Sequence, residues 1–328
     1  MPRESTNLVE VRDLVKRYGR TLAIDGISLD IPRGVRYAIL GPNGAGKTTL
    51  IHVLCTIHRA DSGTATVGGF EVHRDPRRAR QRIGVVFQEP SLDTRLTVQE
   101  NLDFHGRVFG VPRRLRRQRI NELLELVELG DWRDHLVRAL SKGMQRRLEV
   151  ARALVHDASL LVLDEPTVGL DAHTRERMWQ YLGDLQAHRD ITVLVTTHYI
   201  EEVDGCDEVC VVDHGKVLTT GSPTELKARH GRRHVRLTPR DEETATALRV
   251  AHPDATVEGV DVLVPTPDDA SVEALLTTYG SRLRAFSLER PSLESVFLEL
   301  TGRGLRDEGA GARDAMLAAP RSGGEPVR

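Results

Sequence analysis

Apolar and polar positions follow distinct periodicities along the first 222 residues. Predominantly apolar runs predict strands buried on both faces, as in a parallel sheet, at 37–40, 83–87, 160–163 and 191–197. Residues 8–30 alternate between apolar and polar positions, which predicts an antiparallel sheet. Residues 95–155 carry apolar side chains at helical spacing. The pattern therefore predicts an α/β domain, residues 1–222, with an antiparallel β subdomain and a helical insertion.

A second, smaller α+β domain is predicted at 232–303. Strands are expected at 234–237, at 283–288 and twice within 256–264, with helices at 242–250, 272–279 and 293–300. This β-α-β-β-α-β order with a final helix predicts a ferredoxin-like unit. The apolar residues expected to form its small core, with some surplus, are Val262, Val264, Leu275, Leu276, Phe286, Leu288, Val296, Phe297 and Leu300. Residues 304–328, rich in Gly, Ala, Arg and Pro, are expected to be disordered.

The most specific chemical signal lies between the first buried strand and the helix that follows it. Residues 41–49 fit G-x-x-x-x-G-K-[ST], the pattern of a phosphate-binding loop. Glycines let the backbone N–H groups point at phosphate oxygens, and the helix N-terminus favours the same anions. Lys47 is expected to reach the β- and γ-phosphates, and the Thr48 hydroxyl to bind Mg²⁺. A chance glycine turn is the weaker interpretation, because a strand and a helix flank the loop.

Two carboxylates follow the apolar run 160–163. Asp164 and Glu165 would stand at the C-terminal end of a parallel strand, where open α/β sheets bind ligands. Asp164 is expected to hold Mg²⁺ through water, and Glu165 to act as general base on an attacking water. An acidic helix cap is the alternative, but it explains one acid better than two. The segment between loop and strand contains Ser141, which is placed as the N-cap of a helix.

This ordered set resembles the ATP-binding subunit of an ABC transporter over residues 7 to about 222. Six motifs carry the resemblance: the Walker A loop 41–49, the glutamine loop at Gln88, the signature 140–145, the Walker B strand 160–165, the D-loop 169–171 and the switch histidine His198. The resemblance implies catalysis by Lys47, Glu165 and His198. It implies Mg²⁺ contacts from Thr48, Gln88 and Asp164. The implied ATP contacts are Tyr18 against adenine, with Gly41, Pro42, Asn43, Gly44, Ala45, Gly46, Lys47, Thr48, Thr49, Gln88, Ser141 and Gly143.

The resemblance also implies an assembly. In this family ATP lies between the Walker A loop of one subunit and the signature of another, so two copies, or one copy and a related chain, are needed. Ser141 and the N–H group of Gly143 would cap the γ-phosphate across the dimer. Two residues depart from the commonest signature, since Lys142 replaces a glycine and Met144 a glutamine. Lys142 either adds charge near the phosphate or, as we favour, points to solvent.

A subfamily resemblance narrows the expected function. The runs 88–93 and 291–302 resemble daunorubicin-resistance-type ATPases, which drive bacterial drug and lipid exporters. This implies an ATPase at the cytoplasmic face of the membrane that powers separately encoded membrane subunits. An importer ATPase with a regulatory C-terminal domain is one alternative. A soluble ABC protein acting on ribosomes or DNA is another, although such proteins usually carry two ATPase domains or long coiled coils.

Composition adds three restrictions. The formal net charge of −2 gives no global attraction to nucleic acid or acidic lipid, so no nucleic-acid partner is expected. Three cysteines fit a reducing cytosol rather than a disulfide framework. No apolar run approaches the roughly 20 residues that span a bilayer, so the membrane part is expected in another chain. A basic group is expected to be a solvated helix face, with lipid head groups or an acidic partner loop as alternatives: Arg113, Arg114, Arg116, Arg117 and Arg119.

Overall fold

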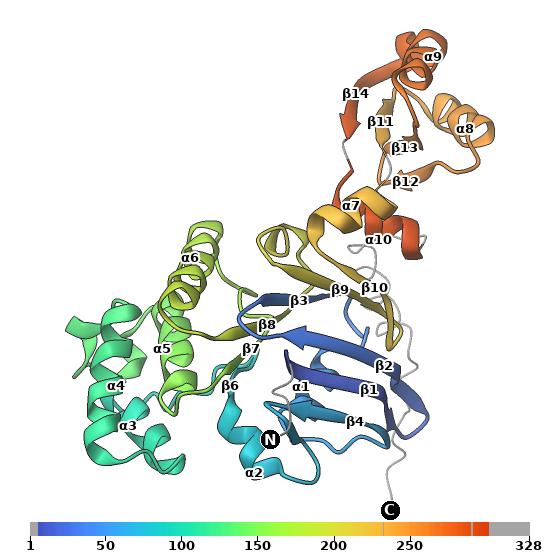
Figure 1. Ribbon diagram of the computed structural model, residues 1–328. Helices are drawn as coiled ribbons and strands as arrows, with labels where there is room; N and C mark the ends of the chain where they lie inside the picture. Colours follow the sequence, from blue (N-terminus) through green and yellow to red (C-terminus); the bar gives the residue numbers. More distant parts are fainter. Residues whose placement is uncertain (1–5, 232, 290, 302–328) are drawn as a thin grey trace, which may run out of the picture. The chain divides into compact units, whose positions relative to one another are not determined.

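The chain divides into two compact units, Met1–Thr220 and Gly221–Arg328 (Figure 1). The computed structural model describes residues 6–231, 233–289 and 291–301. The predicted disordered segment 304–328 lies outside the described residues.

A six-stranded sheet forms the centre of the first unit. Its strand order is β10-β9-β3-β8-β7-β6, and β9, β3, β8, β7 and β6 pair in parallel. Every residue of β7 and β8 is buried, which explains the predominantly apolar runs in the sequence. The strands are β3 Arg36–Leu40, β6 Ile83–Val86, β7 Leu160–Asp164, β8 Thr192–Thr197, β9 Glu208–Asp213 and β10 Lys216–Gly221.

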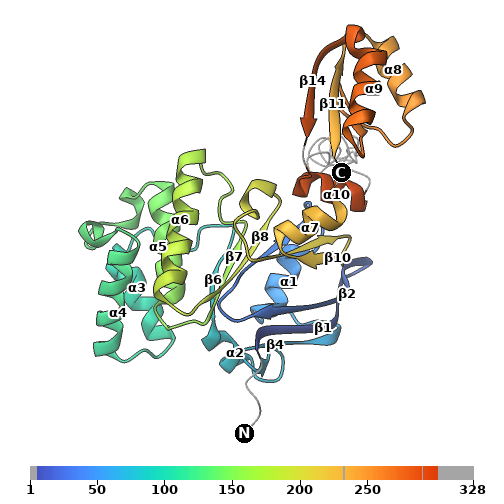
Figure 2. The ribbon, with the colours of Figure 1, turned by 45° about the horizontal axis from the view of Figure 1, so that its top comes forward.

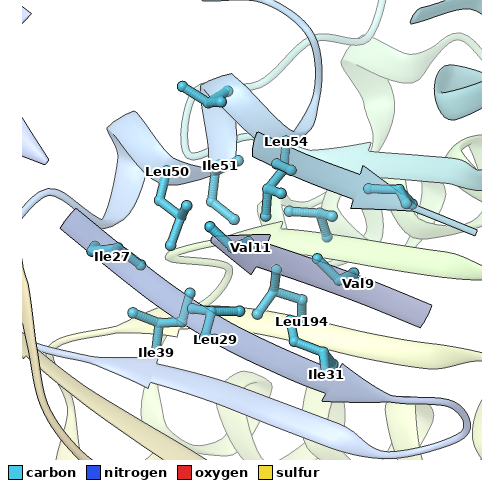
Figure 3. Close-up of a cluster of buried hydrophobic side chains, with 14 of the residues drawn as sticks. Val9, Val11, Ile27, Leu29, Ile31, Ile39, Leu50, Ile51, Leu54 and Leu194 are labelled. Carbon is cyan, nitrogen blue, oxygen red and sulfur yellow. The ribbon is translucent and has the colours of Figure 1, made fainter. Parts of the chain in front are cut away.

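An antiparallel sheet of order β2-β1-β4-β5 makes up the predicted β subdomain. Its strands are β1 Asn7–Tyr18, β2 Thr21–Pro32, β4 Ser62–Val67 and β5 Phe70–Glu71. Helix α1, Lys47–Leu54, buries Leu50, Ile51 and Leu54 in one hydrophobic cluster with both sheets (Figure 3). This shared core fixes the start of α1, and with it the phosphate-binding loop, against two sheets.

Four helices lie between β6 and β8, three before β7 and one after it. They are α3 Val98–Val108, α4 Arg113–Leu126, α5 Lys142–Leu154 and α6 Ala172–His188, and they gather on one side of the unit (Figure 2). The shorter elements of this unit are α2 Pro76–Arg82 and the 3₁₀ turns Gly130–Trp132, Val137–Ala139 and Ile200–Glu202. Helix α3 begins with a capping box formed by Thr97 and Glu100.

The basic group on α4 is not the uniform solvated face that its sequence predicts. Arg113, Arg114 and Arg117 are exposed, but Arg116 is buried and its Nε donates to Asp103 at 2.6 Å. Arg119 is partly buried and is paired with Asp157. The prediction is therefore wrong for Arg116, because α3 supplies a carboxylate that neutralises it.

The second unit has the predicted ferredoxin-like order. After α7 Pro223–His230 come β11 His234–Pro239, α8 Glu242–Ala251, β12 Thr256–Glu258, β13 Asp261–Pro265, α9 Asp269–Tyr279, a 3₁₀ turn Gly280–Arg282, β14 Leu283–Glu289 and α10 Leu293–Thr301. The sheet is antiparallel, in the order β12-β13-β11-β14. Together with the first unit, it confirms the predicted fold class.

Two predicted core residues of this unit are exposed. Phe286 and Leu288 are 56% and 48% exposed, although they pair with the buried Leu237 and Val235 of β11. The reason is their position on β14, an edge strand, whereas α8 packs on β11 and β13. The predicted residues Val262, Val264 and Leu275 do form the core, and Leu276 packs against it; the other members of the cluster are Val235, Leu237, Leu248 and Leu283. The predicted Val296 and Phe297 are also buried, on α10, outside this cluster.

Among the described residues of both units, we find no helix that is long and apolar enough to cross a bilayer.

Candidate functional site

The loop 41–49 joins the end of β3 to the start of α1. Gly44 and Gly46 have φ angles of +83° and +101°, which disfavour any residue with a Cβ. A Cβ on Gly46 would also lie 2.4 Å from the Ala23 carbonyl oxygen, and one on Gly41 would lie 2.3 Å from that of Val212. The glycines are therefore required by the path of the loop. Within the loop, the N–H groups of Gly41 and Ala45 donate to the carbonyl oxygens of Thr197 and Pro42.

Lys47 joins this loop to the end of β7. Its buried ammonium donates to the carbonyl oxygens of Gly41 (2.7 Å) and Pro42 (3.0 Å). Its Nζ also lies 3.4 Å from Oε1 of Glu165. One cation thus touches both the phosphate-binding loop and the predicted general base.

Asp164, the last residue of β7, is 2% exposed. Its Oδ1 accepts hydrogen bonds from the hydroxyl groups of Thr196 (2.5 Å) and Thr48 (3.3 Å). A carboxylate and a hydroxyl oxygen at this distance are ligands of the kind that Mg²⁺ prefers. The donor set present therefore fits the ion that the sequence predicts there.

Glu165 has an unusual backbone for a residue other than glycine. Its φ is +46°, a conformation that costs roughly 1–3 kcal/mol and is concentrated at functional sites. Its N–H group donates to the carbonyl and hydroxyl oxygens of Thr196, both at 3.1 Å. Nδ1 of His198 lies 3.3 Å from its Oε2, so Lys47 and His198 flank the two carboxylate oxygens.

Lys47, Thr48, Glu165 and His198 line one open cavity of about 630 Å³, whereas Gly41, Pro42 and Asp164 are not part of its lining. Its walls are formed by Thr21, Leu22, Ala23, Asn43, Gly44, Gly46, Lys47, Thr48, Thr49, Gln88, Glu165, Val168, His198 and Tyr199. Of the other predicted contacts, Ala45 is packed in the core. Tyr18 does not line the cavity. It is 42% exposed, with its ring edge-on to His58 and near the Lys16 ammonium.

The signature residues lie at a different place. Ser141 caps α5 by accepting a hydrogen bond from the N–H group of Met144 at 3.2 Å. Ser141 and Gly143 line a second cavity, together with Leu170 and Thr174. The structure therefore does not bring them to the phosphate-binding loop of the same chain. Lys142 is exposed to solvent.

Sequence reasoning missed several groups around the site. Glu202 is buried and accepts hydrogen bonds from the hydroxyl groups of Thr167 and Thr197, and burial raises its pKa. These contacts tie the residues just after Glu165 to those just before His198. The sequence signal for Glu202 is only a pair of acids after His198, which suggests an exposed turn.

Two family models match the chain. One, "ABC transporter", covers residues 24–168, and the other, "ATP-binding protein DrrA1-3-like, C-terminal domain", covers residues 221–301. Among solved structures, cbiO1 from Clostridium perfringens, part of the ABC transporter complex cbiONQ, is similar with a TM-score of 0.64 and 29% identity. That match covers 76% of this chain and 97% of cbiO1.

Curated relatives match both units. The daunorubicin/doxorubicin resistance ATP-binding protein DrrA of Streptomyces peucetius is 40% identical over 92% of this chain and 94% of its own length. The Nod factor export ATP-binding protein I of Ralstonia nicotianae is 40% identical over 92% of this chain and 96% of its own length. The linearmycin resistance ATP-binding protein LnrL of Bacillus subtilis is 35% identical over 92% of this chain and 100% of its own length. The chain therefore belongs to the ABC transporter ATP-binding proteins of the daunorubicin-resistance type, a family of enzymes that hydrolyse ATP.

Proposed function

We propose that this chain is the ATP-hydrolysing subunit of a bacterial exporter of drugs, antibiotics or lipids. The proposed ATP hydrolysis rests on the position of Glu165, whose carboxylate lies between Lys47 and His198 in the wall of the cavity. The export part is supported by relatives named for drug resistance or Nod factor export that match over both units. An importer is the weaker candidate, because no feature of the site favours it.

The proposed reaction is an in-line attack of water on the γ-phosphorus of ATP. Glu165 takes a proton from the water, and His198 holds the carboxylate and the water in position. The bond from the γ-phosphorus to the oxygen of ADP breaks, and phosphate leaves. Lys47 and the N–H groups of the loop stabilise the charge on the phosphate oxygens. When bound, Mg²⁺ neutralises part of that charge, and Thr48, Asp164 and Gln88 would hold it.

The site is proposed to be completed by a second subunit. Ser141 and Gly143 stand at the N-terminus of α5, where the N–H groups of the first turn attract anions. Both residues line a cavity apart from the phosphate-binding loop of their own chain. A nucleotide-sandwich dimer would place them on the γ-phosphate of the partner's ATP. The same geometry holds for a homodimer or for a pair with a related chain.

Transport requires a separately encoded membrane subunit, which we propose to bind beside the glutamine loop at the cytoplasmic face of the membrane. Leu92 and Leu96 are half-buried there and offer apolar surface. Val98 and Leu102, further along the same segment, are fully buried and belong to the packing of α3.

Export of a fluorescent anthracycline from cells tests this function. Cells that express the chain with a membrane protein that co-purifies with it should accumulate less of the compound than cells with an empty vector. The Glu165→Gln variant should abolish the difference. Equal accumulation with the wild-type pair and the empty vector, with both proteins present in the membrane fraction, would contradict anthracycline export.

A further inference from the structure

A buried arginine on the signature helix contacts two segments of the nucleotide site. Arg146 lies on α5, and its side chain is 8% exposed. Its Nε donates to the carbonyl oxygen of Pro166 at 2.8 Å, and one terminal nitrogen donates to that of Phe87 at 2.6 Å. Pro166 directly follows Glu165, and Phe87 directly precedes Gln88.

A buried carboxylate on the same helix extends these contacts. Glu149 is paired with Arg146 at 2.8 Å, and its side chain is 3% exposed. Its other oxygen accepts hydrogen bonds from the N–H group (2.8 Å) and the hydroxyl group (3.3 Å) of Ser91. The pair therefore holds the glutamine loop on both sides of Gln88, at Phe87 and at Ser91.

The contact with Pro166 matters because the preceding residue is strained. Glu165 has a φ of +46°, and its N–H group is held by Thr196. Arg146 holds the other side of this turn through the Pro166 carbonyl oxygen. A strained conformation persists only where its surroundings fix it from several sides. A shift of α5 would therefore move one of the two anchors of Glu165.

We propose that Arg146 and Glu149 form a positioning pair that couples the position of the signature helix α5 to the positions of Glu165 and Gln88. Engagement of Ser141 with a partner's nucleotide would then set the geometry of the chain's own general base and glutamine loop. This inference rests on the proposed roles of Glu165 and Ser141. A pair of buried charges is weak evidence for added stability, since desolvation offsets much of its attraction, so a geometric role must be tested directly.

The test is steady-state ATP hydrolysis by the full chain carrying Arg146→Met. We expect kcat to fall roughly 10- to 100-fold, as for small misplacements of catalytic groups, with KM for ATP changed by less than about 2-fold. The matched control is Arg116→Met. The Arg116 side chain is also 8% exposed and bonds a carboxylate and a carbonyl oxygen, Asp103 and Val111, but both lie within the helical insertion. This control should lower the melting temperature and leave kcat near the wild-type value.

A second variant covers the case in which Arg146→Met does not fold. Arg146→Met/Glu149→Leu removes both charges, so no lone charge stays buried, and it should fold and still hydrolyse slowly. Wild-type kcat in a folded variant of either kind would overturn the inference, as would an equal loss of kcat in Arg116→Met. Glu165→Gln is measured in parallel. Fast hydrolysis by Glu165→Gln would refute the proposed catalytic site itself. Slow hydrolysis by Glu165→Gln together with a wild-type kcat for Arg146→Met would refute only the positioning role.

Discussion

At the scale of single residues, the two ends of Glu165 are held by different parts of the fold. Its carboxylate lies between Lys47 and His198, and its N–H group is fixed by Thr196 on β8. The motif 160–165 was enough to predict the acid. The role of Thr196 was not predictable, because it depends on the register of β7 and β8, which sets Asp164 opposite Thr196. A strand register of this kind is tertiary information that no local motif contains.

Replacement of Glu165 by Gln tests the general base. Glutamine keeps the shape of the side chain but cannot take a proton, so kcat should fall roughly 10²–10⁴-fold. Binding of a fluorescent ATP analogue should survive, because the phosphate-binding loop is unchanged. Glu176→Gln, at an exposed position on α6, is the control and should hydrolyse ATP normally. Turnover by Glu165→Gln at the wild-type rate would rule out the assigned role.

Two partly buried histidines make stability depend on pH. Burial lowers the pKa of His105 to about 3 and the pKa of His156 to about 4. The His156 ring stacks on Phe109, and its Nε2 lies 3.0 Å from the Ile83 carbonyl oxygen. Because both rings stay neutral in the folded state, each contributes stability above the unfolded pKa of about 6.5. That stability is lost as pH falls through the folded values, by at most about 1.4 kcal/mol per pH unit and ring.

The measurement is the melting temperature between pH 7 and pH 4. Wild type should lose stability more steeply than His156→Gln, since that variant lacks one ring that titrates on unfolding. The exposed His173, changed to Gln, is the control and should follow the wild-type curve. Parallel curves for wild type and His156→Gln would show that His156 does not titrate with unfolding.

At the scale of elements, predictions succeeded where one segment determines its own environment. The buried strands β7 and β8 were predictable because most of their side chains are apolar, and the role of Ser141 was predictable because capping is local. The burial of one arginine in the basic group on α4 was not predictable, because it depends on Asp103, thirteen residues before Arg116. Phe286 and Leu288 alternate like core residues, but strand order makes β14 an edge.

The glutamine-loop segment offers a prediction about coupling. Leu96 is half-buried, whereas Val98, two residues later, is fully buried. Leu96→Glu should keep basal ATP hydrolysis and reduce co-purification with the membrane subunit, because it adds a charge to the proposed contact. Val98→Glu should instead lower the melting temperature, since it buries an unpaired charge. A Leu96→Glu variant with normal melting and undiminished co-purification would place the membrane contact elsewhere.

At the scale of the whole molecule, the candidate nucleotide site belongs to one of the two units. Every residue that lines the nucleotide cavity lies in Met1–Thr220. The second unit exposes Phe286 and Leu288 on its edge strand, apolar surface of a kind that associates with other chains. We propose that it helps to hold two subunits together or fits the membrane partner.

Deletion of residues 232–328 tests this assignment of roles. The truncated chain should bind ATP as wild type does, and assembly of two chains, measured by sedimentation velocity, should be weaker. The double variant Phe286→Ser/Leu288→Ser should weaken assembly in the same direction without removing the unit. A truncated protein that stays folded and loses ATP binding would contradict the assignment.

The shared nucleotide site is the central claim, and mixing two inactive variants tests it most directly. Lys47→Ala removes the ammonium group of the phosphate-binding loop, and Ser141→Arg blocks the signature with a bulky charged side chain. Each alone should release phosphate far more slowly than wild type, because every site in such a dimer is damaged. A mixed dimer keeps one site with a wild-type loop from one chain and a wild-type signature from the other. We predict that the mixture recovers part of the wild-type rate of phosphate release. A mixture no faster than its separate components, or a Ser141→Arg protein as fast as wild type, would contradict the claim.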